Sequence, residues 1–233
     1  RRLTTNGGLR RESQPSFFCE VLMKLYYTPI KGYVHTVEAV IRYAGLESQI
    51  ELVPTKPFDA ETPLAPINPL GKVPTLVLES GEYLAGGPVI YEYLDSLHRR
   101  RRLYPSKGPQ RWRTLRQAWM ADGLFDTFVL LIIESWLPQA EQRPAYIARS
   151  VGKVIAILDQ LERDVAQYDR LDIGQMRTVG ALQFLRLKWA TTAKALVGVD
   201  PALDIFAGRP LLAAWFAPMA RKKIFRQPLL RME

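Results

Sequence analysis

The apolar residues of the chain follow two different periods, and the change between them falls near residue 98. Four short apolar runs bounded by turn residues are typical of strands, at 24–28, 50–53, 73–78 and 83–84. Apolar positions three and four residues apart predict amphipathic helices from Val34 to about Gly45 and from Val89 to Leu97. The order strand–helix–strand, strand–strand–helix predicts a small mixed sheet with helices packed on it.

The second half of the chain is predicted to be helical. Residues 99–110 form a polar, turn-rich linker, and no convincing strand pattern follows. Helical spacing marks four stretches, at 112–137, 147–161, 179–187 and 211–219. The third of these is preceded by Asp172-x-x-Gln175, a pattern that resembles a capping box. We therefore expect an N-terminal extension (1–22), an α+β domain (23–98), the linker (99–110) and an all-α domain (111–227).

The chain is strongly basic. Its 233 residues include 32 Lys and Arg against 23 Asp and Glu, a net charge of +9, which favours an anionic partner. A small acidic substrate, nucleic acid and a lipid surface all meet that description. Nucleic acid ranks last, because the basic residues are dispersed and no motif of stacking aromatic residues accompanies them. The arginines of the extension are compatible with a nucleic-acid arm, but such a segment is more often a solvated tail.

Several function classes are excluded by what the sequence lacks. One cysteine, Cys19, allows neither an intramolecular disulfide nor a multi-thiolate metal site, and two histidines (His35 and His98) do not make a histidine-rich metal cage. No uncharged apolar run approaches the roughly 18 residues that cross a bilayer. The first 20 residues have no hydrophobic segment of a secretory signal, so a cytoplasmic location without membrane contact is expected. Glycine-rich nucleotide loops and nucleophilic triads are also missing.

The most specific motif is the run Asn-Pro-Leu-Gly-Lys-Val-Pro-Thr-Leu at residues 68–76. It resembles the segment of soluble glutathione transferases that ends in a cis-proline before the third strand. Further stretches at 23–29, 86–94 and 209–215 resemble that family at the expected spacing. The resemblance covers about residues 23–225. It implies a thioredoxin-like N-terminal domain, an all-helical C-terminal domain and a homodimer.

The Val73–Pro74 bond carries a physical argument of its own. A proline bond adopts cis at little cost when a turn holds it. In cis, the Val73 main-chain N–H and C=O would face outward and could pair with a peptide-like ligand as an added strand. The alternative is an ordinary trans proline that opens a strand; the flanking motif favours cis.

The resemblance also implies which residues act on the thiol of glutathione. A free thiol has a pKa near 8.5, which a hydrogen bond or a nearby positive charge lowers. Tyr27 stands where some classes place a catalytic tyrosine, with a buried strand tyrosine as the alternative. Lys31 stands where others have serine or arginine, at the start of a helix whose dipole favours an anion. Thr28 is the weaker hydroxyl candidate.

Glutathione itself is expected to be the co-substrate, bound without a metal. The resemblance places Lys72 at the glycyl carboxylate, with Val73 and Pro74 beside it, and Gly86 and Gly87 at the γ-glutamyl end. The family normally has an acidic residue followed by Ser or Thr at these last two positions, so the γ-glutamyl motif is atypical. The bacterial beta class also has glycine at the second position, and the Gly87 N–H at a helix N-terminus could still bind a carboxylate.

These observations predict an enzyme of detoxification that conjugates the glutathione thiolate to a small apolar electrophile. The alternative is a weak or inactive protein of the same fold that serves as a ligand-binding or protein-interaction module. Aromatic residues at helical spacing lie on the helix that lines the second-substrate pocket in this family, and they are either core or pocket: Trp112, Trp119, Phe125 and Phe128.

Overall fold

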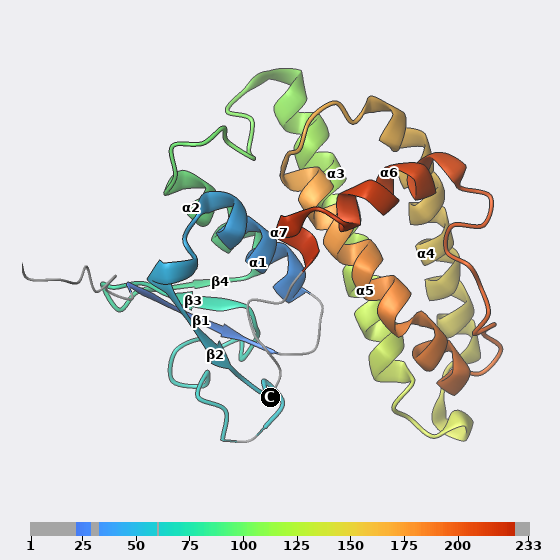
Figure 1. The fold of residues 1–233 in the computed structure, drawn as a ribbon. Coiled ribbons are helices and arrows are strands. Elements are labelled where there is room, and N and C mark those ends of the chain that lie inside the picture. The colour runs from blue at the N-terminus through green and yellow to red at the C-terminus, as the bar shows by residue number, and fades with distance from the viewer. Residues whose placement is uncertain (1–21, 29–32, 60, 227–233) are drawn as a thin grey trace, which may run out of the picture.

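The computed structural model describes residues 22–28, 33–59 and 61–226. The N-terminal domain holds a mixed sheet of four strands in the order β2-β1-β3-β4, in which β1 and β2 are parallel and the other pairs antiparallel (Figure 1). The strands are β1 (Met23–Tyr27), β2 (Ile50–Pro54), β3 (Thr75–Val77) and β4 (Tyr83–Ala85). With α1 (Tyr33–Ala44), the short η1 (Glu47–Gln49) and α2 (Gly87–Ser96), they form the predicted thioredoxin-like domain.

The alternation along β1 decides which side chains reach the core. Met23, Leu25 and Tyr27 are buried, whereas Lys24 points outward and pairs with Glu51 of β2 at 3.2 Å. Successive side chains of a strand face opposite sides of the sheet, so Tyr27 shares the face of Leu25. Helix α1 lies between this sheet and the helical domain, where it contacts α2, α5 and α7 (Figure 1).

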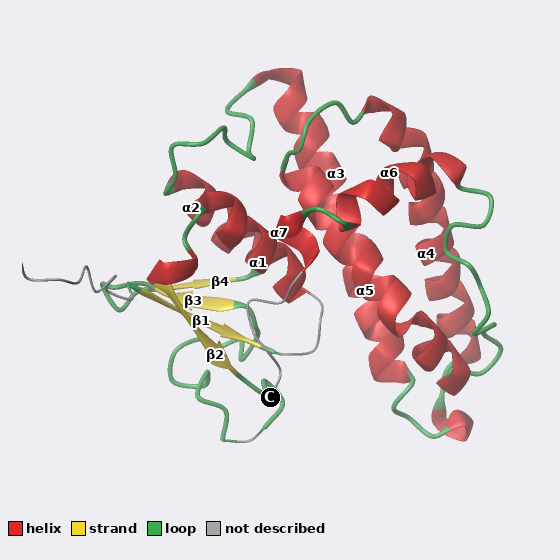
Figure 2. Cartoon of the chain, in the orientation of Figure 1, coloured by secondary structure: helices red, strands yellow, loops and turns green. Residues whose placement is uncertain are grey.

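The rest of the described chain is helical, as Figure 2 shows. The helices are α3 (Gly108–Glu134), η2 (Gln139–Glu141), α4 (Pro144–Asp164), η3 (Val165–Gln167), α5 (Ile173–Ala195), α6 (Pro210–Ala220) and α7 (Lys223–Arg226). Helix α3 begins at Gly108, inside the segment predicted as linker, because Pro109 suits the first turn of a helix. Helix α5 packs against α3 and is buried on all sides from Ile173 to Leu182.

Asp172 caps the N-terminus of α5. Its Oδ1 accepts from the Gln175 N–H at 3.0 Å, and its Oδ2 accepts from the Thr114 hydroxyl of α3 at 2.6 Å. The Gln175 side chain donates to the Arg170 carbonyl instead of returning to the cap residue. Only half of the predicted capping box therefore forms, and the other half joins the cap to the preceding loop.

We expect Asp172→Ala to lower the free energy of unfolding by about 2 kcal/mol, because it removes the cap and leaves the buried Thr114 hydroxyl without its acceptor. Urea unfolding measures this, with Asp172→Asn as the control that keeps a capping oxygen.

Burial raises the pKa of the Asp172 carboxyl, although hydrogen bonds from Thr114 and the helix N–H groups oppose the shift. The native state thus holds this proton more tightly than the unfolded state, so the contribution of Asp172 to stability falls as pH rises through the raised pKa. The Asn variant should gain stability relative to the parent over the same interval, and a difference independent of pH would contradict the assignment.

Candidate functional site

The turn at Lys72, Val73 and Pro74 is held by two buried polar side chains. The Lys72 carbonyl accepts from the Asn68 amide at 3.2 Å and from the Thr75 hydroxyl at 2.8 Å, and Asn68 and Thr75 also bond to each other at 3.0 Å. The Val73–Pro74 peptide bond is cis, the isomer that the sequence motif predicted. Lys72 is exposed, and within the described chain no hydrogen bond uses the Val73 N–H or C=O. Within the described residues, these two main-chain groups are therefore left for another partner.

The N-terminus of α2 meets this turn. The Gly86 N–H donates to the Pro74 carbonyl at 3.2 Å, and Gly86 has a φ of 88°, which favours glycine. This one contact brings together the five residues predicted to bind glutathione: Lys72, Val73, Pro74, Gly86 and Gly87. A strand-like edge and a helix N-terminus thus lie side by side.

The first turn of α2 has the character of an anion site. It contains no acidic residue, and Pro88 has no N–H, so Gly87 and Val89 supply the N–H groups of this turn. The helix dipole adds a partial positive charge at the same end. A carboxylate is the kind of group that such a terminus binds.

Residues of the linker fix the position of this turn, and sequence reasoning missed them. The Tyr104 hydroxyl donates to the Pro88 carbonyl at 3.2 Å. Asp95, near the end of α2, accepts from the main-chain N–H groups of Leu103 and Tyr104 at 2.8 and 3.1 Å, and it contacts His98 at 3.0 Å. No spacing rule joins Asp95 to residues eight and nine positions later, so only the fold reveals this clamp.

The three residues predicted to act on the thiol differ in position. Tyr27 is 2% exposed and lies in the hydrophobic core; burial, and to a lesser degree the Glu38 carboxylate, raise the pKa of its hydroxyl. Thr28 follows the end of β1 and is only partly buried. Lys31 lies outside the described residues, as does Cys19. Of the two described candidates, the threonine has the more accessible side chain.

Known proteins share this fold and parts of this sequence. A family model for the N-terminal domain of glutathione S-transferase matches residues 32–97. A glutathione S-transferase of Methylobacillus flagellatus, solved with glutathione bound, is 27% identical and covers 88% of this chain and 97% of its own, with a TM-score of 0.77. These matches support the soluble glutathione transferase family for this chain.

Two further relatives extend the comparison to other bacteria. A glutathione transferase family member of Pseudomonas fluorescens with bound S-(propanoic acid)-glutathione is 27% identical and covers 90% of this chain and all of its own, with a TM-score of 0.77. The uncharacterized GST-like protein YibF of Escherichia coli is 29% identical over 140 residues, which is 60% of this chain and 68% of YibF.

The four aromatic residues of α3 separate into two groups in this transferase fold. Phe125 and Phe128 belong to the core, where both pack against Phe184 of α5. Trp112 and Trp119 are 68% and 72% exposed on the outside of the helix. The first two are therefore core residues, and the tryptophans lie on the surface.

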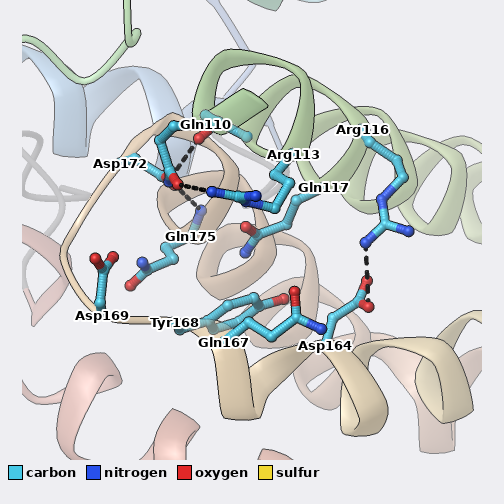
Figure 3. A pocket seen from close by; sticks show the side chains of 11 residues that line it. Gln110, Arg113, Arg116, Gln117, Asp164, Gln167, Tyr168, Asp169, Asp172 and Gln175 are labelled. Carbon is cyan, nitrogen blue, oxygen red and sulfur yellow. Dashed lines mark hydrogen bonds and ion pairs between the residues drawn. The ribbon is translucent and has the colours of Figure 1, made fainter. Parts of the chain in front are cut away.

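Figure 3 shows a polar pocket between α3, η3 and the N-terminus of α5. It contains none of the residues predicted to bind glutathione. Within the described chain, three polar atoms at this pocket have no hydrogen-bond partner: Gln117 Nε2, Asp164 Oδ2 and the Tyr168 hydroxyl. A small space lined by such groups suits ordered water. Asp172, the residue that caps α5, also lines this pocket.

The described residues also bear on a metal site and on a membrane span. Among the residues that the structure describes, no group of three or more His, Cys, Asp or Glu side chains could hold a metal ion. Within the same residues, every helix is too short or too polar to cross a bilayer.

Proposed function

We propose that this chain binds glutathione along the Val73 main chain and the N-terminus of α2, and conjugates its thiolate to a small apolar electrophile. The proposal rests mainly on the hydrogen bond from Gly86 to Pro74, which joins the main chain at Val73 to the N-terminus of α2. A peptide with a carboxylate at each end fits that pairing, because the edge can bond to its backbone and the helix to one carboxylate.

The solved relatives support this ligand. Two of them, each 27% identical to this chain, hold glutathione or an S-substituted glutathione. Lys72 is exposed beside the Val73 edge, where its ammonium group would meet the glycyl carboxylate. The proposal also includes a homodimer and a cytoplasmic location.

The reaction requires an ionised thiol. The glutathione S–H loses its proton to solvent, the thiolate sulfur forms a bond to an electrophilic carbon, and the leaving group departs with the electron pair of the bond that breaks. We assign stabilisation of the thiolate to the Thr28 hydroxyl, with the Lys31 charge as support. The partly exposed position of Thr28 favours it over Tyr27, whose side chain lies in the core.

Calorimetric titration with glutathione tests the binding step. We expect Lys72→Ala to weaken binding about tenfold, because a charge-assisted contact to the glycyl carboxylate is lost. The glycine ethyl ester of glutathione lacks that carboxylate, so its affinity should be nearly the same for both proteins. An equal loss of affinity for glutathione and for its ester would show that Lys72 supports the fold and does not bind the glycyl carboxylate.

The second candidate is a binding or interaction module without transferase chemistry. The core position of Tyr27 and the glycines at 86 and 87 favour it. Its signature would be the absence of measurable heat at millimolar glutathione, together with no conjugation of a generic aryl halide. Binding with conjugation would exclude it.

A further inference from the structure

Gly87 lies directly against the side chain of Tyr91, one turn later in α2. A Cβ atom built on Gly87 would be 2.5 Å from the Tyr91 hydroxyl oxygen, 2.7 Å from Cζ and 3.0 Å from Cε2. Carbon atoms at van der Waals contact are about 3.5–4.0 Å apart. No side chain therefore fits at position 87 while the Tyr91 ring stays where it is.

The Tyr91 ring is buried in the core. Tyr91 is fully buried in the main hydrophobic cluster, and the guanidinium carbon of Arg177 on α5 lies 5.6 Å from its ring centroid. Arg177 is itself buried and forms an ion pair with Asp122 of α3. Because the ring is buried in a close-packed cluster and Arg177 belongs to a packed helix, a movement of the tyrosine would disturb the packing around it.

Position 86 is restricted for a different reason. Nothing lies within 4 Å of a Cβ built on Gly86, but its φ of 88° is a conformation that L-amino acids rarely adopt. An acidic side chain at 86 would strain the main chain, and one at 87 would collide with Tyr91. Within the described chain, the first turn of α2 thus offers main-chain N–H groups and no carboxylate.

We propose that the first turn of α2 recognises the γ-glutamyl end by its carboxylate alone, because the ring of Tyr91, a specificity-determining residue, keeps position 87 free of a side chain and the φ of Gly86 disfavours one at position 86. This inference rests on the proposed glutathione site. The main-chain N–H of Gly87 at the helix N-terminus binds that carboxylate, and no side chain of this turn binds the neighbouring ammonium group. The chain accordingly accepts acidic thiol peptides with or without an α-amino group.

A pair of ligands tests this on the unmodified protein. Glutaryl-cysteinyl-glycine keeps both carboxylates and the thiol of glutathione but lacks the α-amino group. We expect its Kd to lie within about threefold of that of glutathione. A charge-assisted contact to the ammonium would instead make it about 10- to 100-fold weaker, and that result would overturn the inference.

Variants test the role of the ring. Gly87→Ser should weaken glutathione binding at least tenfold, because the new side chain meets Tyr91. The double variant Gly87→Ser with Tyr91→Leu removes the three contacting atoms and should bind within about threefold of the parent. Gly87→Ser with Tyr91→Phe still has Cζ in place and should stay impaired. Gly152→Ser is the matched control, since a Cβ there meets nothing within 4 Å.

The outcomes separate the two proposals. No heat with glutathione for the parent protein overturns the proposed function, and this inference with it. Glutathione binding by the parent combined with full binding by Gly87→Ser, or with rescue by the phenylalanine variant, overturns only the role of Tyr91. Thermal melting of each variant accompanies the titrations, and if the leucine variant does not fold the ligand pair still tests recognition by the carboxylate alone.

Discussion

Replacing Thr28 with valine should lower kcat/KM for glutathione conjugation by about 100-fold. Valine keeps the shape of threonine but removes the hydroxyl that is proposed to stabilise the thiolate. Loss of one hydrogen-bond donor to a developing anion typically costs about 10²–10³ in rate. The pKa of the bound thiol should rise towards the free value near 8.5, so activity should recover at higher pH. Steady-state rates between pH 6 and 9, with a generic aryl halide, measure both effects.

Tyr27→Phe is the matched comparison on the neighbouring residue. Because the Tyr27 side chain faces the core, its hydroxyl is not expected to set the thiol pKa. The pH–rate profile of this variant should keep its midpoint. A midpoint shifted by Tyr27→Phe and left in place by Thr28→Val would reverse the assignment and give the tyrosine the catalytic role.

Breaking the Asp122–Arg177 ion pair should strongly destabilise the helical domain. Both side chains are buried, and Asp122→Asn removes the negative charge that pairs with the guanidinium next to the Tyr91 ring. Removing one partner of such a pair costs about 3–5 kcal/mol. Urea denaturation should show this as a large fall in the midpoint with an unchanged slope.

The double variant Asp122→Leu with Arg177→Met provides the control. It removes both charges and retains much of the volume, so most of the lost stability should return. If the double variant is as unstable as the sum of the two single changes, the pair does not act as a unit and packing alone explains the loss.

The clearest parts of the fold followed from local rules. The strand-like run at 24–28, opened by Met23, predicted β1; the structure buries Met23, Leu25 and Tyr27 because side chains of a strand point alternately to opposite faces. Asp172 predicted the start of α5, because a capping carboxylate bonds to an N–H only three residues away. The sequence could not show that Gln175 would bond to Arg170 instead, since that depends on how the preceding loop packs.

The candidate site could likewise be predicted from the sequence only in part. The motif around Val73 and Pro74 was recognisable by itself, because its residues are contiguous and each shapes its neighbour's main chain. Whether Tyr27 or Thr28 faces the ligand was open, since two adjacent strand residues differ only in which side of the sheet is buried, and tertiary packing decides that.

The sequence by itself indicated the two-domain order, the family and the segment that is proposed to bind glutathione. The tertiary structure alone set Arg177 against the Tyr91 ring that fills the space beside Gly87, from a helix nearly ninety residues away. A side chain is excluded at position 87 because the space beside it is filled, and how that space is filled depends on the elements that pack around it. A pattern along the chain places Tyr91 one helical turn after Gly87, but it does not record which distant side chains pack around the ring.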